Sequence, residues 1–249
     1  MLKKKILLFL CLFTIFFLNF VITSNAAGWG FSRNTNHETP SIGKYQQILE
    51  GTNSFYVGNV NKKEVILTFD AGYDNGNLTP ILDTLRCKNV TASFFVTGDF
   101  VKRFPELVVR MTNDGHIVCN HSYSHKKIQT LSKNELKDDL EKLENAYFEL
   151  TGKTMPKYFR PPEGEFTKES LLNVKNLGYK TIFWSIAYKD WDVRNQKAKE
   201  LAIDSVLNNL HPGAIILLHS VSKTNSEILG TLIEKISDEG YTFKTVLDL

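Results

Sequence analysis

From residue 61 onward the chain alternates short apolar runs, rich in β-branched and aromatic residues, with longer amphipathic stretches, and this alternation limits the possible folds. The apolar runs, which predict strands, are residues 65–69, 92–96, 117–119, 158–159, 181–183, 214–218 and 241–246. The amphipathic stretches, which predict helices, are residues 79–88, 100–111, 133–151, 168–177, 196–210 and 227–238. Strict alternation predicts an α/β domain, residues 61–249, with about seven parallel strands and right-handed crossovers.

Two α/β folds fit this pattern: an open doubly wound sheet and a closed or nearly closed (β/α) barrel. No glycine-rich fingerprint follows the first predicted strand, so a nucleotide-binding version of the open sheet has little support. In both folds function gathers at the carboxyl ends of the strands. Ionisable side chains follow five of these ends, at Asp70, at His121 and His125, at Arg160, at Asp190, and at His219.

His121 and His125 are four residues apart, the spacing at which two imidazoles on one helical turn can face the same ion. Neutral imidazole suits Zn²⁺ and other transition ions, and a metal site that does chemistry keeps one position open for water. The spacing alone is a weak signal, because two structural histidines would look the same.

The other rim residues suggest acid–base chemistry. Near a metal-bound water, Asp70 is a candidate general base, and Arg160, held on a stiff turn by two following prolines, can orient it and keep it ionised. His219 is a candidate general acid because histidine titrates near neutral pH, and Asp190 could fix its tautomer and raise its pKa. Each of these residues also has a purely structural interpretation. Asp70 could cap a strand end, Arg160 could form a structural salt bridge, and His219 could be a core histidine.

The first 26 residues predict a secretory signal. Lys3–Lys5 precede an apolar run, Ile6–Ile22, and small residues at Ser24 and Ala26 favour cleavage after Ala26. The alternative is an uncleaved membrane anchor, and in either case we expect the rest of the chain to be exported across the cytoplasmic membrane.

Residues 27–60 show no sustained period and are interpreted as an arm that packs on the domain through Trp29 and Phe31. Cys87 and Cys119 are expected to be buried, inert thiols. Without Lys3–Lys5, the 30 Lys and Arg become 27 against 27 Asp and Glu, so a basic nucleic-acid binder is excluded.

Five ordered motifs resemble those of the polysaccharide deacetylases, the NodB-like carbohydrate esterases. These motifs are Thr68–Gly72, His121–His125, Arg160–Gly164, Asp190–Trp191 and Leu217–His219. Within that group the chain is similar to the sporulation enzymes that deacetylate N-acetylmuramic acid, the delta-lactam-biosynthetic de-N-acetylases.

The resemblance implies a distorted (β/α) barrel and metal-assisted hydrolysis of a sugar acetamide. It implies that Asp70 is the base, that His121 and His125 bind the metal, and that His219 protonates the leaving amine. Arg160 would position Asp70, and Asp190 would tune His219. The backbone near Glu163 would hold the oxyanion, and Trp184 and Trp191, if they are not core residues, would contact the sugar.

Two positions depart from the family pattern. Ala71 replaces the usual second aspartate, a metal ligand, and Ala187 replaces an earlier acid of the fifth-strand motif. We therefore expect a divalent ion, Zn²⁺, to be held weakly or to recruit another oxygen, with Asp74 the nearest candidate.

The expected partner is the glycan strand of peptidoglycan, after a muramoyl-peptide amidase has removed the stem peptide. The product would lead to muramic δ-lactam in the spore cortex, and the protein would act in the cell wall or the forespore intermembrane space. Three alternatives stay open: a GlcNAc or chitooligosaccharide deacetylase, an inactive glycan-binding module, and a glycosidase that uses Asp70 with Asp190.

Overall fold

The computed structural model describes residues 26–249, so the predicted signal, apart from its last residue, lies outside the described residues. The strands are β1 (Ala27–Gly28), β2 (Ser54–Phe55), β3 (Glu64–Ala71), β4 (Ser93–Val96), β5 (Ile117–Asn120), β6 (Tyr158–Phe159), β7 (Glu165–Phe166), β8 (Lys180–Ile182), β9 (Ala214–His219) and β10 (Thr242–Lys244). The α-helices are α1 (Tyr45–Leu49), α2 (Leu78–Cys87), α3 (Gly98–Arg103), α4 (Pro105–Asn113), α5 (Lys133–Thr151), α6 (Lys168–Asn176), α7 (Lys199–Leu207) and α8 (Lys223–Asp238). The 3₁₀ turns are η1 (Ile128–Thr130), η2 (Pro162–Gly164) and η3 (Val246–Asp248).

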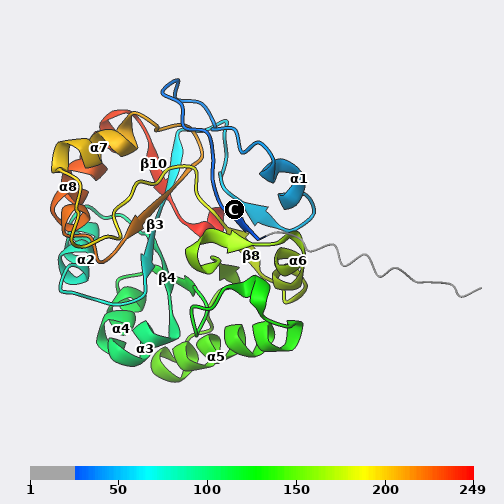
Figure 1. The fold of residues 1–249 in the computed structure, drawn as a ribbon. Coiled ribbons are helices and arrows are strands. Elements are labelled where there is room, and N and C mark those ends of the chain that lie inside the picture. Colours follow the sequence, from blue (N-terminus) through cyan, green and yellow to red (C-terminus); the bar gives the residue numbers. More distant parts are fainter. Residues whose placement is uncertain (1–25) are drawn as a thin grey trace, which may run out of the picture.

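All seven predicted strands form and belong to one parallel sheet, in the order β10-β3-β4-β5-β6-β8-β2, with β9 also paired to β3. The sheet curls until its two sides meet. Beyond β8, the Ser185 N–H donates to the Ile215 carbonyl at 3.0 Å, and the Leu217 N–H donates to the Ile186 carbonyl at 2.9 Å. Figure 1 shows the helices ringed around this sheet, which confirms the distorted (β/α) barrel.

The alternating side chains of β3 explain how the barrel delivers a polar group to its rim. Val65, Leu67, Phe69 and Ala71 belong to the core cluster shared with the outer helices. Successive side chains of a strand point to opposite faces, so residues 66, 68 and 70 face the barrel interior. Ile66 accordingly packs there with apolar residues of β4, β5, β8 and β9. Asp70 is the last inward-facing residue of β3 and lies where the interior opens.

The largest differences from the predicted helix boundaries concern three helices. The helix expected over residues 100–111 is two helices, broken at Phe104 because the residue before Pro105 is disfavoured in the α region. Helix α7 starts only at Lys199, and α8 starts early, at Lys223, where the Ser222 hydroxyl caps it. The predicted capping box of Ser132 and Glu135 begins α5 as expected.

The arm packs on the domain as predicted and also extends the sheet. Trp29 stacks on Phe183 with ring centroids 4.4 Å apart, and Phe31 packs against the same apolar cluster. Strand β2 pairs in parallel with β8, which the sequence pattern did not indicate. Within the arm and domain together, no helix combines the length and apolarity needed to cross a membrane.

The two cysteines differ in environment. Cys119 lies inside the barrel and is buried, as expected, whereas Cys87 is exposed and contradicts the prediction. Cys87 is the last residue of α2, and its side chain falls outside the buried stripe of that helix.

Candidate active site

Asp70 and Arg160 form a buried ion pair at the carboxyl end of β3. Arg160 follows β6 and is fully buried. Its Nη1 donates to Asp70 Oδ1 at 2.7 Å, its Nη2 to Thr68 Oγ1 at 2.9 Å, and its Nε to the Ile182 carbonyl at 3.1 Å. Three fixed acceptors hold the guanidinium in one orientation, so the carboxylate is held in one orientation too.

The charge state of Asp70 follows from this pair. Burial alone would raise the pKa of the Asp70 carboxyl, but the positive charge of Arg160 and its hydrogen bond to the carboxylate outweigh burial and lower the pKa below its ordinary value. Asp70 is therefore ionised at neutral pH and retains one carboxylate oxygen, Oδ2, that Arg160 does not contact.

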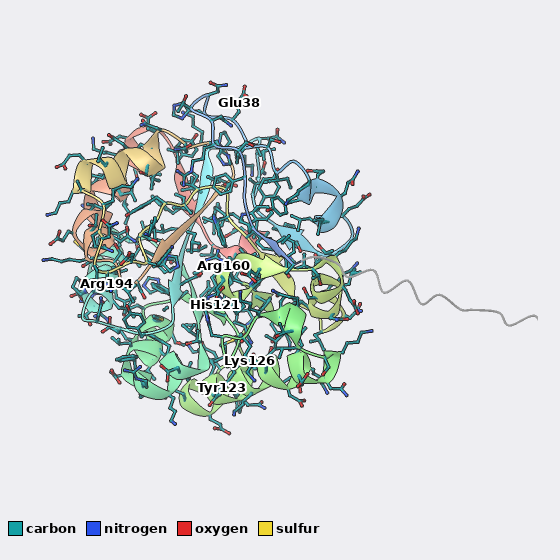
Figure 2. The ribbon with its side chains drawn as sticks, in the orientation of Figure 1. Glu38, His121, Tyr123, Lys126, Arg160 and Arg194 are labelled. Carbon is teal, nitrogen blue, oxygen red and sulfur yellow. The ribbon has the colours of Figure 1, made fainter. Side chains whose placement is uncertain are left out.

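His121 follows β5 and presents one ring nitrogen to Asp70. Its Nδ1 lies 2.9 Å from the Arg160 carbonyl, which can only accept, so Nδ1 carries the hydrogen and Nε2 the lone pair. Nε2 lies 3.6 Å from Asp70 Oδ2. Burial lowers the pKa of His121 to about 4, so its imidazole is neutral at neutral pH. Figure 2 shows His121 and Arg160 close together, inside the ring of helices.

His121 and His125 do come together, with ring centroids 5.0 Å apart, but not on a helical turn as predicted. They lie in a loop in which Ser122 and His125 have positive φ angles of 70° and 54°. The Asp139 carboxylate of α5 fixes this loop by accepting from Ser122 Oγ at 2.7 Å, Tyr123 N at 2.9 Å and Ser124 N at 3.0 Å. Sequence reasoning missed Asp139, because an acid on the polar side of α5 resembles its solvated neighbours.

His219 ends β9 and is held by Asp190. Its Nδ1 lies 2.7 Å from Asp190 Oδ1, and its backbone N–H donates to Asp190 Oδ2 at 2.8 Å. Asn225, also missed from the sequence, donates to Asp190 Oδ2 at 2.6 Å. Burial alone would lower the pKa of His219, but the Asp190 charge outweighs it and raises the pKa above the ordinary value. Asp190 therefore occupies Nδ1, and Nε2 is the ring nitrogen available to a substrate in the cleft.

The segment after Arg160 forms one wall of the site. Glu163 has a φ of 57°, and its carboxylate lies 3.3 Å from Lys127 Nζ. Gly164 has a φ of 65°, and a Cβ there would lie 2.9 Å from the Trp184 ring, so both its conformation and its contact require glycine. The Trp184 carbonyl accepts from Trp29 Nε1 at 2.9 Å, which ties this wall to the arm.

These elements surround a cleft of about 1100 Å³. Seven of the predicted site residues line it: Asp70, His121, His125, Glu163, Trp184, Trp191 and His219. Arg160 and Asp190 are buried behind the lining, in contact with Asp70 and His219. Because Asp190 does not line the cleft, a glycosidase that uses Asp70 with Asp190 has no geometric support.

Asp74 is the predicted site residue that the structure places elsewhere. Its carboxylate accepts from the Leu78 N–H at 3.2 Å and so caps the start of α2, and it does not line the cleft. Proximity in sequence was misleading, because Tyr73 still lines the cleft, whereas Asp74 contacts the start of α2. Cleft residues without a sequence-based prediction include Arg33, Tyr73, Asp99 and Lys189.

Comparison with known proteins identifies this architecture. The profile of the polysaccharide deacetylase family matches residues 57–182, a span from the end of the arm to β8. The chain belongs to the polysaccharide deacetylase family. It is therefore an enzyme of the deacetylase class, and the family fold agrees with the curled parallel sheet described above.

Relatives of this deacetylase include enzymes named for two different sugars. It is 43% identical to the peptidoglycan-N-acetylmuramic acid deacetylase PdaA of Bacillus subtilis, over 92% of this chain and 87% of that protein. The solved PdaA structure, a family 4 carbohydrate esterase, matches with a TM-score of 0.88 over 92% of this chain and 98% of that chain. A peptidoglycan-N-acetylglucosamine deacetylase of Bacillus cereus is 33% identical over 77% of this chain and 70% of that protein.

Deacetylases of this family generally depend on a metal ion. Two features of the cleft fit such an ion. The imidazoles of His121 and His125 are adjacent, and His121 Nε2 has a free lone pair because the ring hydrogen is on Nδ1, bonded to the Arg160 carbonyl. Across residues 26–249, however, no group of three or more His, Cys, Asp or Glu is arranged to hold a metal. Ala71, at the position of the family's second aspartate, is buried in the core and has no side-chain atom that can bind a metal. The residues present therefore fit an ion held by two protein nitrogens, one from His121 and one from His125.

Proposed function

We propose that this deacetylase removes the N-acetyl group from N-acetylmuramic acid residues of peptidoglycan strands that lack stem peptides. The observation that carries the proposal is the pairing of Asp70 with Arg160 and of His219 with Asp190 around one cleft. One pair presents an ionised carboxylate, and the other presents an imidazole with a raised pKa. The identity with PdaA over 92% of the chain supports muramic acid as the sugar.

In the proposed reaction, Asp70 accepts a proton from the water that attacks the acetamide carbonyl carbon. We assign the developing oxyanion to backbone N–H groups near Glu163, which lines the same cleft. His219, protonated on both nitrogens and held by Asp190, then gives its Nε2 proton to the sugar nitrogen as the C–N bond breaks. The products are acetate and the free amine. The chemistry that a divalent ion supplies when bound by His121 and His125 is Lewis-acid polarisation of the carbonyl.

The cellular setting belongs to the same proposal. Residues 1–26 would direct export, so the enzyme would act in the cell wall or the forespore intermembrane space. It would follow a muramoyl-peptide amidase, and the exposed amine of its product would lead to muramic δ-lactam in the spore cortex.

The test is acetate release from two glycan preparations, one stripped of stem peptides and one with stem peptides intact. Each is incubated with the purified protein, with and without a chelator, and again after Zn²⁺ is added back. We expect acetate from muramic acid in the stripped glycan, loss of activity with chelator and recovery with Zn²⁺.

Each other result selects an alternative. Acetate from N-acetylglucosamine residues alone would favour a GlcNAc deacetylase, the activity for which the B. cereus relative is named. New reducing ends without acetate would favour a glycosidase, and bound glycan without acetate would favour an inactive glycan-binding module.

A further inference from the structure

The charged side chains that line the cleft are nearly all neutralised by a protein partner. Asp70 pairs with Arg160 at 2.7 Å, and Asp99 pairs with Arg103 at 3.1 Å. On the other walls, Glu163 pairs with Lys127 at 3.3 Å and Lys189 with Asp192 at 3.4 Å. The remaining charged lining residue is Arg33, and among residues 26–249 no carboxylate oxygen lies within 4.0 Å of its guanidinium.

Arg33 is nevertheless held in place. It belongs to the arm, which Trp29 anchors through its stacking on Phe183 and its hydrogen bond to the Trp184 carbonyl. One guanidinium nitrogen, Nη2, donates to the Ala187 carbonyl at 2.7 Å. A guanidinium carries five N–H donors in a planar fork, so this one bond leaves several donors and the full positive charge of a cleft-lining residue available to a ligand.

We propose that Arg33 binds a carboxylate of the substrate, namely the lactyl carboxylate of a muramic acid residue without its stem peptide. This inference rests on the proposed function and adds a specificity residue to it. Arg33 and Ala187 line the same cleft as His219, and Ala187 lies three residues before Asp190, which holds His219. A sugar bound for deacetylation would therefore share this cleft with the guanidinium.

The chemistry of the lactyl group explains why such a contact selects stripped glycan. The free lactyl group ends in a carboxylate, which forms a charge-assisted and often bidentate pair with arginine. A stem peptide converts that carboxylate into a neutral amide, and N-acetylglucosamine has no lactyl group at all. A single cation can therefore distinguish stripped glycan from stem-bearing glycan and from N-acetylglucosamine. A reaction that hydrolyses the lactyl amide must come first, because it supplies the stripped glycan.

The test compares wild-type protein with Arg33→Gln and Arg33→Lys on four glycans. These are stripped peptidoglycan glycan, the same glycan with its lactyl carboxylates converted to methylamides, stem-bearing glycan, and chitooligosaccharide. For Arg33→Gln we expect kcat/KM on the stripped glycan to fall by roughly 10-fold or more, mainly through a higher KM. This is the loss expected when one charge-assisted hydrogen bond is removed. Activity on the methylamide and on chitooligosaccharide should match wild type, and Arg33→Lys should recover part of the loss.

Arg194→Gln is the matched control, because Arg194 is exposed, does not line the cleft and lies toward the edge of the molecule in Figure 2. It should behave as wild type on all four glycans. Equal loss by Arg33→Gln on carboxylate and methylamide, or no loss on either, would overturn the inference while leaving the proposed function intact. A loss confined to stem-bearing glycan would assign Arg33 to a peptide carboxylate instead. Wild-type protein that is inactive on muramic acid would overturn both.

Discussion

Arg160 Nη1 lies 2.7 Å from Asp70 Oδ1, although the two residues are 90 positions apart in the sequence. The pair is buried at the rim of the barrel, and Thr68 Oγ1 and the Ile182 carbonyl accept from two further donors of the guanidinium. A buried carboxylate stays charged only with such a partner, so Arg160 is a positioning residue on which the ionised state of Asp70 depends.

Replacing Arg160 is expected to destabilise the fold. Arg160→Met leaves Asp70 buried without its cation, which typically costs about 3–5 kcal/mol. The free energy of unfolding in urea measures the effect. Arg103→Met is the matched control: its ion pair with Asp99 is exposed on both sides and contributes at most about 1 kcal/mol. Similar stability losses in the two variants would contradict the importance assigned to burial.

Asp70→Asn and His219→Ala are each expected to lower kcat by on the order of 10²-fold or more, because each removes one proton-transfer group. Steady-state acetate release measures kcat, and the circular dichroism spectrum verifies folding. Asp83→Asn, an exposed carboxylate of α2, should keep wild-type turnover. Wild-type turnover in either test variant would refute the acid–base assignment.

Asp190→Asn is expected to move the alkaline limb of the kcat–pH profile to lower pH. His219 acts in its protonated form, and Asp190 raises its pKa, so the wild type stays active to higher pH. Without that charge the imidazole loses its proton at a lower pH. The profile is measured between about pH 5 and 9. Asp192→Asn changes a nearby carboxylate that contacts Lys189, and it should leave the limb in place.

His116 should make stability depend on pH outside the site. Burial lowers the pKa of His116 from 6.5 to about 4, and its Nε2 is buried without a hydrogen-bond partner among the described residues. Between these pH values the unfolded chain binds the extra proton, so the unfolding free energy falls as pH falls, by up to about 1.4 kcal/mol per pH unit. His116→Gln should flatten the decline in urea stability between pH 6.5 and 4. An unchanged decline would show that other groups cause it.

Gly98→Ala is expected to disturb the loop that carries both histidines. A Cβ at Gly98 would overlap the Tyr123 ring and would lie 2.6 Å from the Tyr123 carbonyl oxygen. The overlap should cost about 1–3 kcal/mol and lower kcat, since Tyr123 lies between His121 and His125. Urea unfolding and acetate release measure the two effects. Gly230→Ala, in α8, is the control, because a Cβ there would lie no closer than 3.6 Å to its nearest neighbour, Thr84 of α2, and alanine favours helix.

Much of the fold could be predicted because its signals are local. Val65–Phe69 and Ala214–Leu218 are short, largely apolar runs typical of buried strands, and Ser132 with Glu135 marks the start of α5 within the sequence itself. Parallel strands share one polarity, so Asp70, His121, Arg160 and His219 had to reach the same rim once the alternation was recognised.

The contacts that assemble the site are long-range and left no local signal. Asp139 lies among other acids of α5, and only the folded loop shows that its carboxylate accepts from residues 122–124. Asp74 was a candidate ligand by sequence proximity, yet the turn after Gly72 directs it to the start of α2. Arg33 enters the cleft because the arm folds back onto the segment after β8.

Local sequence signals predict the alternation of strands and helices, the direction of the strands and the residues at their ends, because hydrophobic period and capping act over a few residues. Tertiary contacts, in contrast, determine which of those residues meet, which are buried behind the cleft and which face it. Charge state and orientation depend on partners distant in the chain, and burial changes their pKa values and hydrogen bonds in ways that spacing cannot encode.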